Sequence, residues 1–286
     1  MDSSRIADMA QQQSDRIRTL EQRAIADATR PLAAAVADAQ AAALTRWVRE
    51  TVSTQLPAKL SEFIDWVRQL ISSAFRGKAV QAQAAAERAA STAAQQGVQH
   101  ASQIAAAARR QPTPPVTLEP GDEAQQAAQS IPPAIEQEQS SALALLTTAA
   151  LTATGLAGLN SVFKRARRAV GRIATATAVA VGAAAANGAR LVARALGSDV
   201  RLLWVAEVGA CAACRAYAGL TIKPGQLFPG GLSLDPRRTV FVTPIPGPPR
   251  HPHCRCAVIP WSATWPLDGT PLAHLLRTRA LTDRRP

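Results

Sequence analysis

Apolar and small residues recur every three or four positions along the first 110 residues, which is the spacing of amphipathic helices. Over residues 4–30 they form one narrow stripe, interrupted by Gln13, and this is typical of a weak coiled-coil seam. Pro31 suits the first turn of a helix, so we expect a second helix to begin there and to continue to Pro57. The pattern predicts a helical arm over residues 1–110.

The strongest amphipathic pattern in the chain covers residues 60–75. Its apolar stripe consists of Leu60, Phe63, Ile64, Val67, Ile71 and Phe75. We expect this stripe to face the chain's own core, with docking on another subunit as the alternative. Gly77 predicts the end of the helix. Residues 78–109 are almost entirely Ala, Gln and Ser, and predict a long helix that needs a partner for stability.

Composition favours helices throughout the chain. Hydrophobic residues make up 47% of the 286 residues but aromatic residues only 4%, so alanine supplies most of the apolar count. Alanine favours helices but buries little area, so we expect no large core. The expected fold class is mainly α, with a long Ala-rich helical N-terminal arm and a small α+β module near the C-terminus.

Charge is distributed unevenly along the chain. Residues 111–140 contain six prolines and five acids but no base, which predicts an extended, solvated linker. Residues 141–286 contain 18 bases and five acids, so this part carries +13 while the whole chain carries +12. A basic half indicates an anionic partner, such as DNA, a membrane surface or an acidic protein, or else serves solubility.

Residues 141–198 predict Ala-rich basic helices. Two uncharged runs, residues 139–163 and 173–189, lie on either side of a basic cluster. Their Ala, Thr, Ser and Gly content favours buried or self-associating helices and no membrane contact, with a membrane-active protein using residues 139–189 as the alternative. The bases that could contact nucleic-acid phosphates are Lys164, Arg165, Arg167, Arg168 and Arg172.

Two cysteine motifs lie in the last third of the chain. Residues 200–208 predict a short strand, and GACAACRAYAG follows with Cys211 and Cys214 in CxxC spacing. Residues 239–244 predict another strand, which is followed by HPHCRC at residues 251–256. The two motifs hold all four cysteines and two of the four histidines. This clustering is typical of a zinc ribbon or zinc knuckle.

Zinc takes four tetrahedral ligands and prefers thiolates and imidazoles. The candidate ligands are Cys211, Cys214, His251, Cys254 and Cys256. A turn brings residues three apart together, whereas alternate residues of an extended segment lie several ångströms apart. We therefore prefer the set Cys211, Cys214, His251 and Cys254. In the alternative all-cysteine site, Cys256 replaces His251.

The first 30 residues alternate acids and bases without an apolar segment, so we expect no secretory signal and a reducing compartment. There cysteines serve as metal ligands more often than as disulfides, which are the competing interpretation together with free buried thiols. A catalytic zinc needs an open position and a nearby general base. Glu207 is the only acid close to either motif, and it lies in the predicted strand. We expect a structural zinc and no enzyme; the alternative is a zinc-dependent hydrolase or nucleic-acid-processing protein using His251 or His253.

The order W-x6-C-x-x-C at residues 204–214, a Gly- and Pro-rich stretch, and HP-x-CRC at residues 251–256 resembles the C-terminal domain of phage head-morphogenesis proteins, the minor head proteins of the phage Mu F type. The resemblance assigns residues 199–262 to a metal-binding module. The metal-binding positions it implies are Cys211, Cys214, His251, Cys254 and Cys256. His253 departs from the pattern, because it adds a competing imidazole at the variable position.

The resemblance further implies a minor capsid protein of a tailed bacteriophage. Such a protein is expected in several copies at the portal vertex of the virion, after assembly in the host cytoplasm. Its expected partners are the portal or the major capsid protein, on which the helical arm docks unless it self-associates. Head assembly and DNA packaging or delivery are the implied roles. The basic half, with a basic helix and tail over residues 263–286, would then lie near packaged DNA and contact its phosphates without sequence preference.

Overall fold

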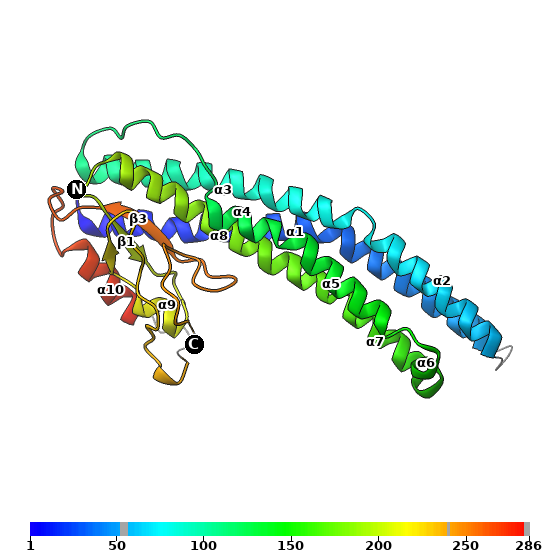
Figure 1. Ribbon diagram of the computed structural model, residues 1–286. Helices are drawn as coiled ribbons and strands as arrows, with labels where there is room; N and C mark the ends of the chain where they lie inside the picture. The colour runs from blue at the N-terminus through cyan, green and yellow to red at the C-terminus, as the bar shows by residue number, and fades with distance from the viewer. Residues whose placement is uncertain (52–56, 239–240, 283–286) are drawn as a thin grey trace. The chain divides into compact units, whose positions relative to one another are not determined.

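The computed structural model describes residues 1–51, 57–238 and 241–282 of the chain (Figure 1). Helices account for 68% of the structure, and the described residues form one small three-stranded sheet. The prediction of a mainly α protein with a small α+β part is confirmed.

The helices longer than ten residues are α1 (Ser3–Thr51), α2 (Pro57–Phe75), α3 (Lys78–Arg109), α5 (Ile131–Ala144), α7 (Leu156–Ala166), α8 (Arg168–Ala195) and α10 (Leu272–Thr282). The short helices are α4 (Asp122–Gln129), α6 (Thr148–Thr154) and α9 (Ala212–Ala216). The strands are β1 (Arg201–Val205), β2 (Thr221–Ile222) and β3 (Ala257–Trp261). Helices α2, α3 and α10 and strand β1 occur where the sequence predicts them.

Internal contacts divide the chain into two compact units. Unit 1 comprises Met1–Arg23, Glu87–Ala127 and Ala178–Pro286, and unit 2 comprises Ala24–Ala86 and Ala128–Thr177. Helices α1, α3 and α8 contribute residues to both units. The expected arm and the expected basic helices are therefore each divided between the units.

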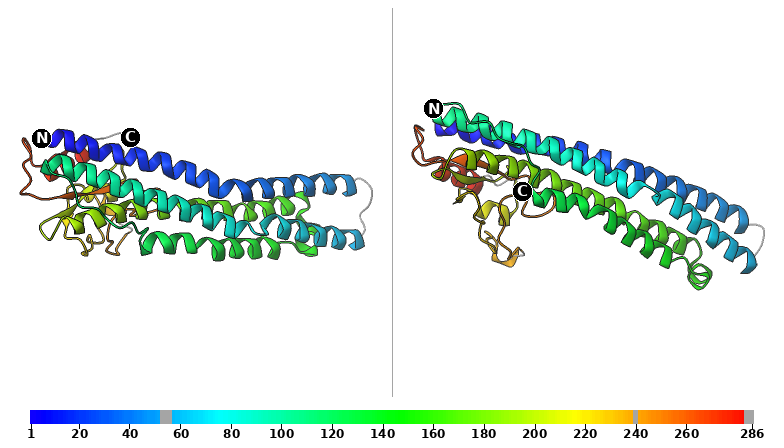
Figure 2. Two further views of the ribbon diagram at one scale, coloured as in Figure 1. Left: turned by 90° about the horizontal axis from the view of Figure 1, so that it is seen from above. Right: turned by 45° about the horizontal axis from the view of Figure 1, so that its top comes forward.

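Unit 2 is a helical bundle with an apolar core. Figures 1 and 2 show its segments of α1, α2, α5 and α7 lying side by side. The apolar stripe of α2 faces this core, since Phe63, Val67 and Ile71 are buried together with Leu32 of α1 and Phe163 of α7. The stripe thus packs within the chain, as the sequence predicts.

Pro31 does not begin a second helix, and the expectation of two helices in this region is wrong. It lies inside α1, which runs on to Thr51. A proline in a helix interior removes one backbone hydrogen bond and costs roughly 3 kcal/mol. Ala28, Leu32 and Val36 follow one another at four-residue spacing and are all buried in the core of unit 2. Their burial on both sides of the proline offsets that cost.

The expected linker over residues 111–140 lacks helix and strand only as far as the start of α4. The remainder forms α4 and α5, contrary to the prediction. Pro132 and Pro133 lie in the first turn of α5, where a missing N–H group leaves no hydrogen bond unmade. Ile131 and Ile135 are buried in the core of unit 2. These prolines therefore start a helix instead of preventing one.

The sheet of unit 1 has the order β2-β1-β3, with both pairings antiparallel. Leu203 and Val205 of β1 pack against α10 and the first turns of α1. Leu202 and Trp204 point to the other face and pack against α8 and Tyr217. Apolar side chains therefore cover both faces of β1, which holds its C-terminal end in place.

The strand expected at residues 239–244 is not found in its described part. Residues 241–244 belong to no strand, and residues 239–240 lie outside the described residues. The guanidinium group of Arg250 donates hydrogen bonds to the backbone carbonyls of Phe241 and Thr243. A side chain thus occupies carbonyl groups that a neighbouring strand would otherwise bind.

Leu156–Ala195 is long and apolar enough to cross a membrane by length and composition alone. Within its most apolar window, 67% of the residues are buried inside the structure. Because a buried core helix meets the same criteria, this stretch is weak evidence for a membrane span.

Candidate metal centre

The antiparallel pairing of β1 and β3 brings the two cysteine motifs to the same end of the sheet. Val205, the last residue of β1, pairs with Ala257, the first residue of β3. Cys211 lies shortly after β1, and Cys256 directly precedes β3. Because antiparallel strands run in opposite directions, the segment after one strand meets the segment before the other.

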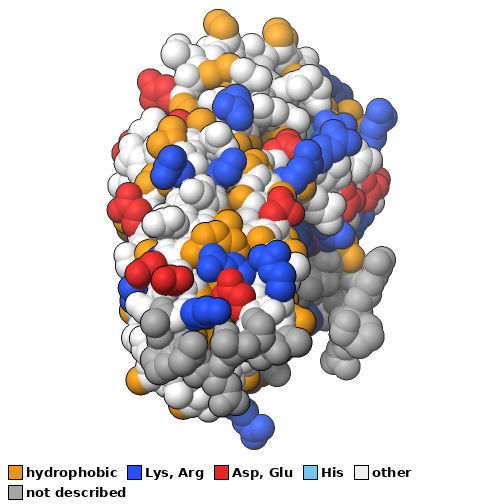
Figure 3. Space-filling view, turned by 90° about the vertical axis from the view of Figure 1, so that its right-hand side faces the viewer, with side chains coloured by type: hydrophobic (Ala, Val, Ile, Leu, Met, Phe, Trp, Pro, Cys, Tyr) orange, Lys and Arg blue, Asp and Glu red, His pale blue; other side chains and the backbone are white. Residues whose placement is uncertain are grey.

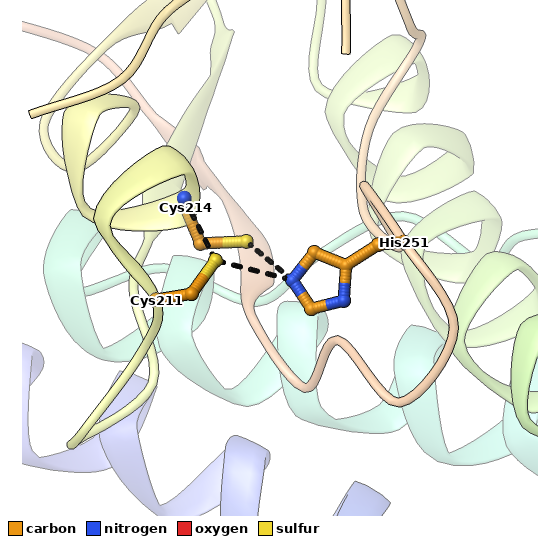
Figure 4. Close-up of side chains that lie close together, drawn as sticks. All are labelled: Cys211, Cys214 and His251. Carbon is orange, nitrogen blue, oxygen red and sulfur yellow. Dashed lines mark hydrogen bonds between the residues drawn. The ribbon is translucent and has the colours of Figure 1, made fainter. Parts of the chain in front are cut away.

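The CxxC motif lies at the start of α9. Cys211 is the N-cap residue, and its Sγ accepts a hydrogen bond from the backbone N–H of Cys214 at 3.5 Å. Cys214 is buried, whereas Cys211 is exposed. The short helix thus directs two sulfur atoms toward one point (Figure 4).

The HPHCRC motif folds into a turn, as predicted for residues three apart. The backbone N–H of Cys254 donates to the carbonyl of His251 at 3.0 Å. Figure 4 shows the imidazole of His251 directed at the CxxC sulfurs, and its Nε2 lies 3.3 Å from the Sγ of Cys211 and 3.3 Å from that of Cys214. The Sγ atoms of Cys214 and Cys254 are 3.5 Å apart.

The five predicted metal-binding side chains form two groups of three that share Cys214. One group contains Cys211, Cys214 and His251, and the other contains Cys214, Cys254 and Cys256. Within each group the donor atoms lie within 4.8 Å of one another, so each group could hold a metal ion. All four cysteines are free and form no disulfide.

His251 is oriented in the way that metal-binding histidines commonly are. Its Nδ1 lies 2.8 Å from the carbonyl oxygen of Pro252. Since a carbonyl only accepts hydrogen bonds, Nδ1 carries a proton, which leaves Nε2, facing the sulfurs, as the nitrogen available to a metal ion. The ring also stacks on Phe241, with centroids 5.6 Å apart and planes 22° apart. Sequence analysis did not identify Phe241 as part of this site.

Because the donor groups lie close together, they shift one another's pKa values. Hydrogen bonds with Cys214 and His251 lower the pKa of the Cys211 thiol to about 4. The hydrogen bond with Cys211 raises the pKa of His251 to about 9. Hydrogen bonds with Cys214 and Cys256 hold the pKa of Cys254 well below its ordinary range, whereas those with the neighbouring sulfurs raise the pKa of Cys214. A cation favours thiolates and a neutral imidazole, so binding it releases protons.

Glu21 of α1 holds the HPHCRC motif in place, and sequence analysis did not single it out. Its side chain is 2% exposed, and its carboxylate lies 2.8 Å from Nδ1 of His253 and 3.1 Å from Nε of Arg255. His253 therefore pairs with an acid and belongs to neither ligand group. Glu21 follows Ile17 by four positions and precedes Ala24 by three, so an acid on this buried stripe was the available signal.

Glu207 lies beyond the end of β1, outside the strand in which the sequence placed it. Its carboxylate pairs with the guanidinium group of Arg18, and Nη1 of Arg255 is 3.9 Å away. A carboxylate held by two guanidinium groups is poorly placed to activate water as a general base.

Two of the bases predicted to contact nucleic acid are engaged within unit 2. Nε of Arg165 lies 2.9 Å from the carboxylate of Glu138, and Nε of Arg172 lies 3.4 Å from it. The Glu138 side chain is buried, so it requires such partners. These two arginines therefore stabilise the bundle and contribute less positive charge to the surface than the sequence suggested.

Arg172 remains exposed, and so are the other three bases of this cluster. Arg167 hydrogen-bonds to Gln40, while Lys164 and Arg168 line an open hollow of about 520 Å³ between α5 and α7. In the face shown in Figure 3, Lys and Arg side chains lie among Asp and Glu side chains. Exposed bases therefore line this hollow, and on the face shown in Figure 3 they lie next to acidic side chains.

No protein-family model matches the sequence, and comparison with curated proteins and with solved structures also finds no match. A function is therefore inferred from the sequence motifs and from the geometry of the described residues.

Proposed function

We propose that the chain is a minor capsid protein of a tailed bacteriophage, acting in head assembly at the portal vertex, with one structural Zn²⁺ ion closing the module over residues 199–262. The observation that carries the proposal is the meeting of CxxC with HPHCRC around the shared donor Cys214. These motifs, in this order, are those that resemble the phage Mu F-type minor head proteins, and their donor atoms form two groups of three that meet at Cys214.

The donor set supports zinc. Thiolates and an imidazole select zinc over oxygen-binding cations such as Mg²⁺ and Ca²⁺. A zinc ion with tetrahedral bonds of 2.3 Å to two sulfurs separates those sulfurs by about 3.8 Å. The sulfurs of Cys214 and Cys254 are 3.5 Å apart, and small displacements of the side chains bring them to that separation.

We assign the four ligands as Cys211, Cys214, His251 and Cys254. His251 is favoured because its Nε2 faces both CxxC sulfurs and its Nδ1 is held by a backbone carbonyl. Cys256 is the ligand that replaces His251 in the alternative assignment, since it is buried beside Cys214 and Cys254.

Two features support a structural ion over a catalytic one. A catalytic zinc keeps one position open for water and places a general base beside it. Neither ligand group contains a carboxylate, and three of the four cysteines are buried. The nearby acids, Glu21 and Glu207, are both engaged by basic side chains. This arrangement favours a protein without enzymatic activity.

The proposed partners are the portal or major capsid protein and, for the basic half of the chain, packaged DNA. The resemblance supports the first, and the net charge of residues 141–286 supports the second. Within the predicted basic cluster, Lys164 and Arg168 are the bases best placed for phosphate contact, because no acidic side chain lines their hollow.

Metal analysis tests the zinc centre. Protein purified without added metal is analysed by mass spectrometry, and thiols are counted after denaturation in the presence of a chelator. We expect one zinc per chain and four free thiols. Two disulfides and no metal would contradict the proposal. A Cys214→Ser variant should lose the zinc, because this residue belongs to both ligand groups.

Analysis of particles tests the virion role. A lysate of the host that produces the chain is fractionated on a density gradient, and DNA-filled heads are examined for the chain by mass spectrometry. We expect the chain in filled heads at a few copies per particle. Filled heads that form normally and lack the chain would overturn this role and leave the zinc centre to be judged separately.

A further inference from the structure

A second site lies in unit 1, in a cavity of about 330 Å³ between α1, α3 and α8. None of the five candidate metal ligands lines it. Its volume falls at the lower end of the range of about 300–1,000 Å³ that is usual for small-molecule sites. The cavity is large enough for a molecule of a few heavy atoms, and its lining residues are different from those of the candidate metal centre.

Two buried lining residues carry polar atoms without a well-formed hydrogen bond to any residue that the structure describes. His100 is 4% exposed and Gln13 is 3% exposed. Within the described residues neither ring nitrogen of His100 makes a well-formed hydrogen bond, although the backbone of Met9 lies close enough to affect its pKa, and Oε1 of Gln13 makes none. Each buried polar atom left without a partner costs about 1–3 kcal/mol. These atoms have almost no accessible surface in this structure, so a polar occupant of the cavity offsets the cost when the two side chains turn toward it.

Two exposed arginines line the cavity as well. Arg16 and Arg23 are seven residues apart on α1, which places them two turns apart on the same face. The amides of Gln96 and Gln99 on α3 complete the polar lining, and no acidic side chain takes part in it. Guanidinium groups bind carboxylates and phosphates through paired hydrogen bonds, so this end of the cavity suits an anion.

The protonation state of His100 fits a cavity that has a cationic end at the two arginines and an uncharged end at the buried side chains. Burial lowers the pKa of His100 to about 4, the nearby Arg16 lowers it further, and the carbonyl of Met9 raises it in part. At neutral pH the ring is therefore uncharged and offers one hydrogen-bond donor and one acceptor. Together with the Oε1 acceptor of Gln13, it suits hydroxyl groups, which both donate and accept.

We propose that this cavity binds a small hydroxylated anion, with its carboxylate or phosphate on Arg16 and Arg23 and its hydroxyl groups on Gln13 and His100. The cationic end supplies affinity for the anion, and the uncharged buried end selects for hydroxyl groups. The site is independent of both the metal centre and the virion role.

Isothermal titration calorimetry of the full chain tests this site. The probes are glycerol 3-phosphate and glycerate, which pair hydroxyl groups with a phosphate and with a carboxylate, respectively. We expect saturable binding of at least one of them with a Kd below about 1 mM. Glycerol and inorganic phosphate, which each carry one half of the chemistry, should bind at least tenfold more weakly. Equal binding of inorganic phosphate, or no saturable binding of either full probe, overturns the proposal.

Three variants separate this site from general charge effects. Arg16→Ala and Arg23→Ala change exposed side chains and should each weaken binding at least tenfold without loss of folding. Arg5→Ala is the matched control, because Arg5 is exposed on α1 but does not line the cavity. An equal loss in Arg5→Ala would show that net charge alone holds the anion.

A fourth variant tests the buried end. His100→Leu should abolish the preference for glycerol 3-phosphate over inorganic phosphate while leaving the melting temperature unchanged or higher, since it removes polar atoms without partners. A preference that persists in a folded His100→Leu protein would show that His100 makes no contact with the ligand.

Discussion

The carboxylate of Glu21 and the imidazole of His253 are 2.8 Å apart, although 232 positions separate these residues in the chain. Glu21 also binds Arg255, so the residues on both sides of Cys254 are held by α1. His253 has a φ of 61°, which is uncommon for a residue other than glycine, and the contact with Glu21 helps to hold it there. The loop that carries the candidate metal ligands therefore depends on a helix near the other end of the sequence.

A Glu21→Gln substitution should weaken this attachment. We expect the free energy of unfolding to fall by about 1–3 kcal/mol, because Arg255 and His253 lose a buried ionic partner. Urea denaturation followed by tryptophan fluorescence measures the change. The control is Asp27→Asn, which removes an exposed partner of Arg30 and should change stability by less than about 1 kcal/mol. Equal effects of the two substitutions would show that Glu21 does not anchor the loop.

Removal of the metal should loosen unit 1 beyond residues 199–262. Metal binding is coupled to folding in such sites. The HPHCRC loop contacts Glu21, which belongs to the segment Met1–Arg23 of unit 1. After chelation, hydrogen exchange should quicken in β1, in β3 and in Met1–Arg23, while the core of unit 2 keeps its protection. Faster exchange confined to residues 199–262 would mean that α1 is independent of the metal centre.

Cobalt substitution identifies the fourth ligand. We expect His251→Ala to lower cobalt affinity at least tenfold and Cys256→Ser to leave it within a few-fold, because Nε2 of His251 faces both CxxC sulfurs. The absorption of the bound ion reports the number of thiolates, and three are expected in the unaltered protein. Four thiolates, with affinity retained in His251→Ala, would establish the all-cysteine site instead.

His100 should make the stability of the protein depend on pH. Its pKa is about 4 in the folded chain against an ordinary 6.5, so folding disfavours the charged ring. The free energy of unfolding therefore has its full value above pH 6.5. It falls by about 3 kcal/mol as the pH falls from 6.5 toward 4, because the unfolded chain takes up the proton more readily. Denaturation midpoints of the unaltered protein and His100→Leu, compared between pH 7.5 and pH 4.5, isolate this contribution. Parallel curves for the two proteins would exclude it.

Gly97 should tolerate no side chain, because α3 and α8 approach closely at this point. A Cβ atom there would collide with the backbone carbonyl of Ala185. We expect Gly97→Ala to lower the free energy of unfolding by about 1–3 kcal/mol. Gly171→Ala in α8 is the control, since nothing lies near its added Cβ and alanine favours helices by about 1 kcal/mol. If thermal denaturation shows both variants to be stabilised, the helices do not pack this closely.

Some features of this protein could be derived from the sequence because they depend on neighbouring residues. Spacing and alanine content located α2 and α3, and the CxxC and HPHCRC motifs identified every side chain of the two ligand groups. The turn between His251 and Cys254 was also predictable, since three-residue spacing is a local property. Local propensity failed at Pro31, because burial of the apolar stripe on both sides decides whether a helix continues.

Only the tertiary structure decided which segments meet. The strand that brings the two cysteine motifs of the candidate metal centre together is β3, after the HPHCRC motif, and its pairing with β1 follows from burial on both faces of the sheet. Glu21 became part of the site because α1 packs in the same unit, an association between residues more than 200 positions apart. Residues 131–144, rich in prolines at their start, form a helix because two isoleucines are buried in unit 2. Residue spacing encodes local geometry, whereas these associations depend on how much apolar area distant segments bury together.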